Sequence, residues 1–351
     1  MTGLHFHPLK VASMRAEADD ALAVSFDVPD TLAERFRFAP GQYLTLRAQV
    51  NGEELRRSYS ICAAPGEALR VGVRRVPGGA FSSWLHGGVK AGDTLDVMEP
   101  QGRFGAALAR HPHHVLLVAG GSGITPILSL LKAALADTRA RCTLVYANRS
   151  VASTMFKEEI EDLKNRHLAR LAVHTVFSRE AVDTPLNAGR VDAEKLATVL
   201  RLCGPVDEAF VCGPHAMNDE VEAGLLAAGL APERIHVERF GVPPSAPPVQ
   251  PVQPSDAASA RVTVVRDGVT REIGYGPDDA NLLAAAARAG LDVPYSCRSG
   301  VCATCRCKLL EGQVRMDRNF ALEKADLDAG FVLACQAHPL SARVTLSFDE
   351  R

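Results

Sequence analysis

The sequence predicts three domains: an antiparallel β-barrel, a doubly wound α/β domain with a parallel sheet, and a smaller C-terminal domain. Residues 1–108 carry short alternating apolar runs separated by turns such as Pro40-Gly41 and Gly92-Asp93, which is typical of a barrel or sandwich. Residues 109–240 alternate strand-sized apolar runs with helical patterns, which favours a parallel sheet. A proline-rich linker over residues 241–260 separates these domains from residues 261–351.

The elements of the first two domains follow from the period of their apolar residues. The predicted strands of the first domain are ALAVSF (21–26), QYLTL (42–46), ELRRSYSI (54–61), ALRVGVRRV (68–76) and DTLDVM (93–98). Those of the second are VLLVA (115–119), TLVYA (143–147), VHTVF (173–177) and AFVC (209–212). Spacing of three and four residues predicts a helix over 127–135 and another that includes Phe156, Ile160 and Leu163.

The tail has its own pattern. Asp267-Gly268 lies between two alternating runs and predicts a hairpin. A helix is predicted to end at Gly290, and residues 344–348 read as a final strand. Prolines are concentrated between Pro243 and Pro254, so the linker favours an extended conformation, in which twenty residues could span roughly 60 Å.

Composition narrows the class of protein. The 351 residues include 39 basic and 41 acidic side chains, so the formal net charge of −2 gives no support for nucleic-acid binding. We find no apolar stretch of membrane-spanning length and no signal peptide, and therefore expect a soluble, cytoplasmic protein. In a reducing compartment, clustered cysteines more often bind metal than form disulfides.

Four cysteines in the tail have the spacing C-x4-C-x2-C-x29-C: Cys297, Cys302, Cys305 and Cys335. This is the spacing of plant-type ferredoxins, which ligate a [2Fe–2S] cluster. Small residues in the loop CRSGVCATC would let the backbone fold closely around such a cluster. Structural zinc and a redox dithiol at Cys302 and Cys305 are the weaker alternatives. Cys307 is expected to be a bystander.

A glycine-rich loop, AGGSGITP (119–126), joins a predicted strand to a predicted helix. Glycines allow close approach of the backbone to a pyrophosphate, and the helix N-terminus attracts phosphate. The expected nucleotide-binding residues are Gly120, Gly121, Ser122, Gly123, Thr125 and Pro126. A glycine-rich turn without a ligand is the alternative.

The ends of later strands suggest which nucleotide binds. Arg149 follows the second strand, and Ser178 and Arg179 follow the third. Asn148, Arg149 and Ser150 at the end of the second strand include no acidic residue for the ribose hydroxyls, and arginine suits a 2′-phosphate, so we expect NADPH rather than NADH. Arginines that are merely solvated at the strand ends are the alternative. Cys212-Gly213-Pro214 follows the fourth strand. Cys212 is either a core residue or a neighbour of the nicotinamide.

The strand RSYS combines three groups that a flavin requires. Arg57 offers a cation for the phosphate, Tyr59 an aromatic face and Ser60 a hydroxyl, and side-chain alternation places Arg57 and Tyr59 on one face. Farther along, GGAFSSW precedes a predicted short helix and could cradle a second phosphate. An ordinary edge strand is the alternative.

Taken in order, RSYS, GGAFSSW, GGSGITP and CGP resemble the ferredoxin–NADP⁺ reductase superfamily. With the cysteine-rich tail, the whole chain resembles oxygenase reductase components, and YANRSVASTMFKEEI, FVCGPHAMND and HVERF resemble the phenylacetyl-CoA epoxidase reductases. The resemblance implies a β-grasp fold for the tail. It also implies that FAD is bound by Arg57, Ser58, Tyr59, Ser60, Gly79, Phe81, Ser82 and Ser83. This chain departs from close relatives at Ser83, where they often have asparagine.

The resemblance further implies an activity. NADPH would reduce FAD by hydride transfer, with Ser60 and Cys212 close to the path of the hydride. Electrons would then pass through the [2Fe–2S] cluster to a separate oxygenase. Nicotinamide contacts would come from residues 120–126 and from Cys212, Gly213 and Pro214. The alternatives are a reductase for a Rieske-type oxygenase such as a ketosteroid hydroxylase and, remotely, a zinc-stabilised nucleotide-binding module.

Overall fold

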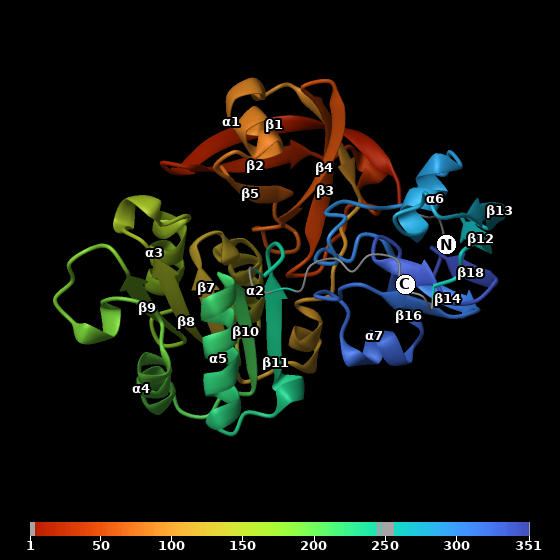
Figure 1. Cartoon of the computed structure of the whole chain (residues 1–351). Helices are drawn as coiled ribbons and strands as arrows, with labels where there is room; N and C mark the ends of the chain where they lie inside the picture. The colour runs from red at the N-terminus through yellow and green to blue at the C-terminus, as the bar shows by residue number, and fades with distance from the viewer. Residues whose placement is uncertain (1–3, 244–245, 247–255, 351) are drawn as a thin grey trace. The chain divides into compact units, whose positions relative to one another are not determined.

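The computed structural model describes residues 4–243, 246 and 256–350 (Figure 1). It divides into two compact units. The larger unit is formed by His7–Leu55 and Tyr59–Phe240, and the smaller mainly by residues from Gly241 onward. Residues 244–245 and 247–255, which belong to the predicted proline-rich linker, lie outside the described residues.

The larger unit begins with a six-stranded sheet in the order β4-β3-β6-β1-β2-β5. Its strands are β1 (Phe6–Ala18), β2 (Ala21–Asp27), β3 (Tyr43–Val50), β4 (Glu53–Ser60), β5 (Arg70–Arg74) and β6 (Thr94–Met98). A bridge between Ile61, just beyond β4, and Val71 in β5 links the two outer strands. Helix α1 (Ala80–Gly88) follows β5, and Phe81 and Leu85 on it join the apolar core of this sheet.

A five-stranded sheet completes this unit, in the order β11-β10-β7-β8-β9. Its strands are β7 (His114–Gly120), β8 (Arg141–Asn148), β9 (Leu171–Phe177), β10 (Glu208–Gly213) and β11 (Ile235–Arg239). Each neighbouring pair is parallel. Strand order reverses at β7, which comes first in the chain among the strands of this sheet, so ligands are expected in the crevice between the carboxyl ends of β7 and β10.

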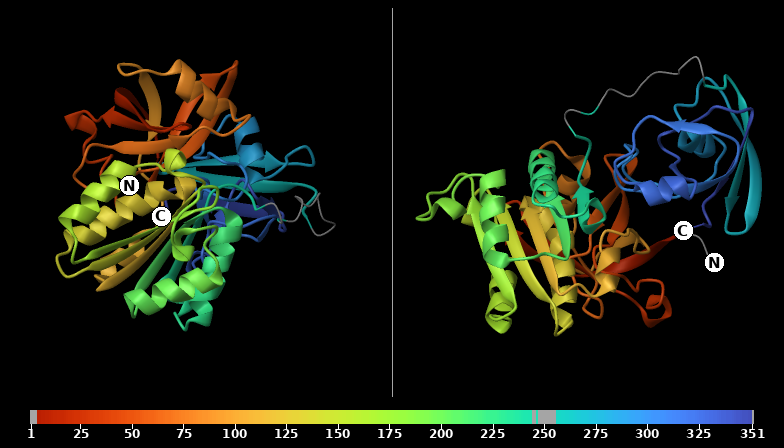
Figure 2. Two further views of the ribbon diagram at one scale, coloured as in Figure 1. Left: turned by 90° about the vertical axis from the view of Figure 1, so that its left-hand side faces the viewer. Right: turned by 90° about the horizontal axis from the view of Figure 1, so that it is seen from below.

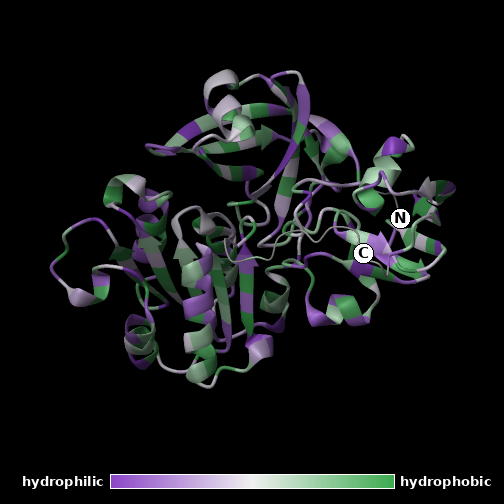
Figure 3. Ribbon diagram, viewed as in Figure 1, coloured by the Kyte–Doolittle hydropathy of each residue, from purple (hydrophilic) through white to green (hydrophobic). Residues whose placement is uncertain are grey.

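Helices cover both faces of the parallel sheet (Figure 2). Side chains alternate along β7: Leu117 packs with α2 (Ile124–Ala136) and α3 (Lys157–Arg166), while Leu116 packs with α4 (Ala193–Cys203) and α5 (His215–Ala227). Figure 3 shows hydrophilic and hydrophobic residues alternating along α5, which buries Val221 and Leu225. The predicted doubly wound domain is confirmed. Phe156 is not part of α3 but precedes it, with a φ of 55°.

The smaller unit contains a five-stranded sheet in the order β13-β12-β18-β14-β16. The strands of this unit are β12 (Ala260–Arg266), β13 (Val269–Tyr275), β14 (Arg306–Glu311), β15 (Val314–Met316), β16 (Phe331–Leu333), β17 (Ala337–Pro339) and β18 (Arg343–Ser347). Its helices are α6 (Leu282–Arg288) and α7 (Lys324–Asp328). Asp267 and Gly268 have φ values of 54° and 71°, as the predicted two-residue hairpin turn requires.

Within the described ranges, no helix has both the length and the apolar composition needed to cross a membrane.

Candidate functional site

The glycine-rich loop lies where the strand order reverses. Gly120 ends β7, and residues Gly121–Gly123 form one turn of 3-10 helix that leads directly into α2. Gly121 has a φ of 53°, which glycine adopts without strain. The Thr125 hydroxyl donates to the Ser122 carbonyl at 3.0 Å and closes the turn. The loop therefore presents the N-terminus of α2 at the crevice, as phosphate binding requires.

Two of these glycines are required by close packing against the end of β10. A Cβ at Gly123 would lie 2.0 Å from the Cys212 carbonyl oxygen, a backbone atom. A Cβ at Gly120 would lie 2.6 Å from Pro214 Cδ. The structure thus brings the predicted residues 120–126 together with Cys212, Gly213 and Pro214. The N-terminus of α2 and the Cys-Gly-Pro turn thus meet at the crevice where a pyrophosphate is expected, so the residues present fit a dinucleotide.

Cys212 itself is fully buried and belongs to the apolar core beneath the loop. Burial raises the pKa of its thiol, and the nearby Glu238 carboxyl raises it further. Glu238 is its register partner on β11, and burial raises the pKa of Glu238 to about 8. Glu238 was not singled out from the sequence, although its place in the HVERF run after the Cys-Gly-Pro turn was a usable signal.

The predicted ribose-side residues also lie together. The Arg179 backbone N–H donates to the Arg149 carbonyl at 2.8 Å, and that of Ser178 donates to the Asn148 carbonyl at 3.0 Å. The Arg149 guanidinium pairs with Asp20 at 3.1 Å, and Asp20 comes from the turn between β1 and β2. Sequence reasoning missed Asp20, because the sequence gives no sign that a turn of the first domain reaches this edge.

Arg74 is a second residue from the first domain at this edge. Its Nε lies 3.1 Å from Asp20 Oδ1, and its NH2 group donates to the Ser153 carbonyl at 2.6 Å. Its NH1 group lies 3.1 Å from the position of a Cβ at Gly121. Arg74 therefore places a cation beside the phosphate loop.

The candidate flavin residues lie at the end of β4 and the start of α1. Arg57 is exposed, Tyr59 is half-buried and Ser60 is buried, so the expected alternation is present. The Tyr59 and Phe81 ring centroids are 6.1 Å apart. Phe81 is buried in the core, and Ser82 Oγ accepts from the Val76 backbone N–H at 3.1 Å, so Ser82 shapes the loop.

These features are compatible with FAD. A cation and an aromatic ring lie on the same face of β4, and α1 begins just after a Gly78 with a φ of 73°. Gly79 caps α1, and Ser83 is exposed on its first turn, where donors for a phosphate are available. Ser58 lies between Arg57 and Tyr59 on β4.

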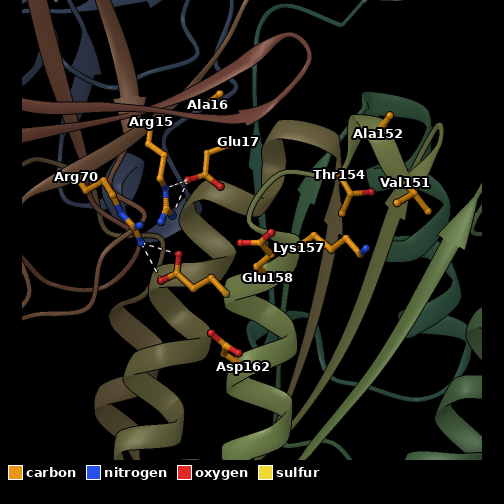
Figure 4. Close-up of a pocket in the computed structure, with 11 residues that line it drawn as sticks. Arg15, Ala16, Glu17, Arg70, Val151, Ala152, Thr154, Lys157, Glu158 and Asp162 are labelled. Atoms are coloured by element: carbon orange, nitrogen blue, oxygen red, sulfur yellow. Dashed lines mark hydrogen bonds and ion pairs between the residues drawn. The ribbon is translucent and has the colours of Figure 1, made fainter. Parts of the chain in front are cut away.

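A polar cavity of about 490 Å³ lies between β1, β5 and α3 (Figure 4). Arg70 on β5 reaches across and donates to both carboxylate oxygens of Glu159 on α3, each at 2.9 Å. Lys132 on α2 also pairs with Glu159 and lies 2.7 Å from Glu67. This ion-pair network joins the barrel-like sheet to the parallel-sheet domain within the larger unit.

The four predicted cysteines form two close pairs in the smaller unit. Cys297 and Cys302 face each other, and their hydrogen bond lowers the pKa of the first thiol and raises that of the second. Cys305 and Cys335 do the same, with the pKa of Cys335 lowered and that of Cys305 raised. Two thiol pairs match a cluster of two irons, each of which takes two cysteines. Among the described residues, no group of three or more His, Cys, Asp or Glu side chains could hold a single metal ion.

The loop around these cysteines supplies N–H donors. The Ser299 N–H donates to Cys297 Sγ at 3.4 Å, and the Cys297 N–H donates to Cys302 Sγ at 3.5 Å. Arg298, Gly300 and Ala303 all have positive φ, which turns the backbone around the thiols. Gln336 donates from Nε2 to Cys335 Sγ at 3.4 Å. Gln336 was not singled out from the sequence, although it directly follows a predicted ligand.

Comparison with known proteins agrees with this arrangement. Residues 8–105 match the oxidoreductase FAD-binding domain, residues 117–223 the oxidoreductase NAD-binding domain and residues 264–340 the 2Fe-2S iron-sulfur cluster binding domain. A component of 1,2-phenylacetyl-CoA epoxidase from Escherichia coli (strain K12) is 44% identical, over 99% of this chain and 98% of that protein. The chain belongs to the family of oxygenase reductase components.

Other proteins also match this chain over nearly its full length. The ferredoxin reductase component of 3-ketosteroid-9-alpha-monooxygenase from Rhodococcus rhodochrous is 35% identical, over 97% of this chain and 96% of that protein. The structure of phthalate dioxygenase reductase superposes with a TM-score of 0.59 at 25% identity, over 97% of this chain and 98% of that chain. The chain is an oxidoreductase with FAD-binding, NAD-binding and [2Fe–2S]-binding domains, so the predicted fold class and family are confirmed.

Proposed function

We propose that this chain is the NADPH-dependent reductase of an oxygenase that epoxidises phenylacetyl-CoA. The observation that carries this proposal is the 44% identity to the epoxidase component across nearly the full length of both chains. It is supported by the presence in one chain of the three domain types that electron transfer from a nicotinamide nucleotide through a flavin to an iron–sulfur cluster uses. The proposed limits are residues 1–108 for FAD, 109–240 for the nucleotide, 241–260 for the linker and 261–351 for the cluster.

When bound, FAD accepts two electrons as a hydride from the nucleotide and releases them one at a time to the [2Fe–2S] cluster. The chain's own residues bind and orient these groups. Arg57, Tyr59 and Ser60 would hold the flavin on β4, with the phosphates at Gly79 and Ser83. The loop from Gly120 to Pro126, together with Cys212, Gly213 and Pro214, would hold the nicotinamide nucleotide. Cys297, Cys302, Cys305 and Cys335 would ligate the cluster.

The fully buried Cys212 would act by packing beneath the nicotinamide, and not by proton transfer. Its raised thiol pKa keeps it neutral. Ser60, which is also buried, would place a hydroxyl beside the flavin ring. Neither role requires a proton to leave the side chain.

The preference for NADPH rests on the cations at the strand ends. Arg149 and Arg179 are joined by a backbone hydrogen bond, so both lie at the edge where the adenosine ribose is expected. A guanidinium can bind a 2′-phosphate through two parallel hydrogen bonds. We therefore propose that NADPH is oxidised with a higher kcat/KM than NADH.

A reductase for a ketosteroid monooxygenase is the second candidate, supported by 35% identity to such a component. The higher identity to the epoxidase component favours the first candidate. We infer a cytoplasmic site of action, because free thiols for cluster assembly persist in a reducing compartment.

The test uses the purified full chain with its cofactors and three separately purified oxygenases: a phenylacetyl-CoA epoxidase, a ketosteroid monooxygenase and a phthalate dioxygenase. We expect NADPH-driven product formation with the epoxidase to exceed that with the other two by at least about tenfold. Equal or better coupling with the ketosteroid enzyme would replace the first candidate with the second. Absence of flavin and iron from the protein after reconstitution would overturn both.

A further inference from the structure

The turn between β1 and β2 places a carboxylate at the nucleotide edge of the neighbouring domain. Asp20 is fixed there by its backbone, because the Arg75 N–H donates to the Asp20 carbonyl at 2.7 Å. The turn belongs to the same compact unit as Arg149, so their ion pair is internal to that unit. An acidic side chain from the first domain thus lies against the cation that follows β8.

Asp20 binds two arginines with its two carboxylate oxygens. Oδ1 lies 3.1 Å from Arg74 Nε, and Oδ2 lies 3.1 Å from Arg149 NH2. The Arg74 side chain is 18% exposed and is also anchored to the Ser153 carbonyl, whereas the Arg149 side chain is 52% exposed. Arg149 is therefore the partner that a ligand can reach.

A second carboxylate near this edge already has a structural role. Glu180 Oε2 accepts from the Val151 backbone N–H at 2.6 Å and so stabilises the turn after Arg149. Asp20 is the one whose ion pair occupies the Arg149 guanidinium itself.

We propose that Asp20 is a nucleotide-selectivity residue that limits the preference for NADPH by competing with the 2′-phosphate for Arg149. This inference rests on the proposed function of Arg149. A 2′-phosphate that binds Arg149 must displace the carboxylate or lie beside it, and like charges at such separations repel. NADH lacks this phosphate, so the same carboxylate costs its binding much less.

Because Asp20 also pairs with Arg74, the quantity to compare is the ratio of kcat/KM for NADPH to kcat/KM for NADH. Its NH1 group lies beside Gly121 in the phosphate loop, and the pyrophosphate expected there is common to NADPH and NADH. Any release of Arg74 on loss of Asp20 acts on both nucleotides alike. Only the change at Arg149 separates them.

The experiment compares Asp20→Asn with Asp19→Asn in the full-length holoprotein. Asp19 is the exposed neighbour in the same turn, so this control makes the same change in net charge. We expect Asp20→Asn to raise the NADPH/NADH ratio of kcat/KM by about tenfold, and Asp19→Asn to change it by less than about twofold. In an Arg149→Gln background, Asp20→Asn should leave the ratio unchanged.

Calorimetric binding of 2′,5′-ADP and 5′-AMP to the same proteins gives a readout independent of turnover. Asp20→Asn should tighten 2′,5′-ADP by about tenfold and leave 5′-AMP within about twofold. A ratio that falls, or that matches the Asp19 control in both assays, would overturn the inference. If neither nucleotide is oxidised, the proposed function fails, and the binding arm still decides the role of Asp20.

Discussion

The ion-pair network around Glu159 is the feature whose removal should most clearly weaken the larger unit. Glu159 is 19% exposed and receives two hydrogen bonds from Arg70, which is 16% exposed, and an ion pair from Lys132, which is 8% exposed. In Glu159→Gln the neutral amide leaves Arg70 without its carboxylate partner. Lys132 keeps Glu67 at 2.7 Å.

The expected loss follows from these exposures. Breaking a buried ion pair by removing one partner costs about 3–5 kcal/mol. Because the cavity beside Arg70 is open to water and Lys132 keeps a second partner, we expect the lower end, about 3 kcal/mol. For a unit of this size, that loss lowers the melting temperature by about 6–12 °C.

The pH dependence of stability tests independently whether the Glu159 carboxylate stabilises the fold. Burial opposes ionisation of Glu159, but the hydrogen bonds from Arg70 and Lys132 outweigh it, so its pKa lies below the ordinary value. Such a carboxylate stabilises the fold above its unfolded-state pKa, and this stabilisation is lost as the pH falls through the folded-state pKa. The difference between wild type and Glu159→Gln should therefore be full at neutral pH and shrink in acid.

The assay is thermal unfolding of the full-length holoprotein by circular dichroism at pH 7 and at pH 4. Glu158→Gln is the matched control, because Glu158 is the preceding, exposed residue of α3. If Glu159→Gln melted within about 2 °C of Glu158→Gln at pH 7, the network would not join the two domains as argued.

Three further predictions test other parts of the site. Gly123→Ala should lower the rate of flavin reduction by NADPH at least about 100-fold in stopped-flow measurements, because the added Cβ would lie 2.0 Å from the Cys212 carbonyl oxygen. A rate within about threefold of wild type would contradict the close packing of Gly123 against β10. Gln336→Leu should lower the midpoint potential of the cluster by about 60 mV in an EPR-monitored titration, because the reduced cluster loses a hydrogen-bond donor to Cys335 Sγ. An unchanged potential would rule out that Gln336 stabilises the reduced cluster. Glu238 has a folded-state pKa of about 8, so between pH 6 and pH 8 the folded protein keeps a proton that the unfolded chain has lost, and the melting temperature should fall over this range. Glu238→Gln should flatten this fall, and parallel curves for the two proteins would contradict the raised pKa.

Local patterns predicted much of the fold, but irregular backbone escaped them. The hairpin at Asp267-Gly268 and the runs that became β7 to β10 follow directly from turn chemistry and apolar periodicity. Strand β1 was not predicted, because register shifts between Val11 and Ser13 and between Ala16 and Ala18 break its alternation. Phe156 was assigned to a helix because its buried ring continues the apolar pattern, yet its backbone is left-handed.

The candidate site divides in the same way. Glycine loops and cysteine spacings are local signals, so the nucleotide loop and the four ligand cysteines could be expected from the sequence, whereas the division of these cysteines into two pairs could not. Asp20 and Arg74 reach the nucleotide edge from a different sheet, and only the packing of the two domains brings them to Arg149 and Gly121. Their own sequence context is an ordinary turn and an ordinary strand end.

Reduction of the cluster by nucleotide is the most direct test of electron transfer from NADPH to the iron–sulfur domain. We predict that anaerobic NADPH generates the low-temperature EPR signal of a reduced [2Fe–2S] cluster, close to one spin per chain, and that Cys305→Ser lacks this signal while its flavin is still reduced. A wild-type cluster that dithionite reduces but NADPH does not, although the flavin is reduced, would contradict electron transfer from the flavin to the cluster.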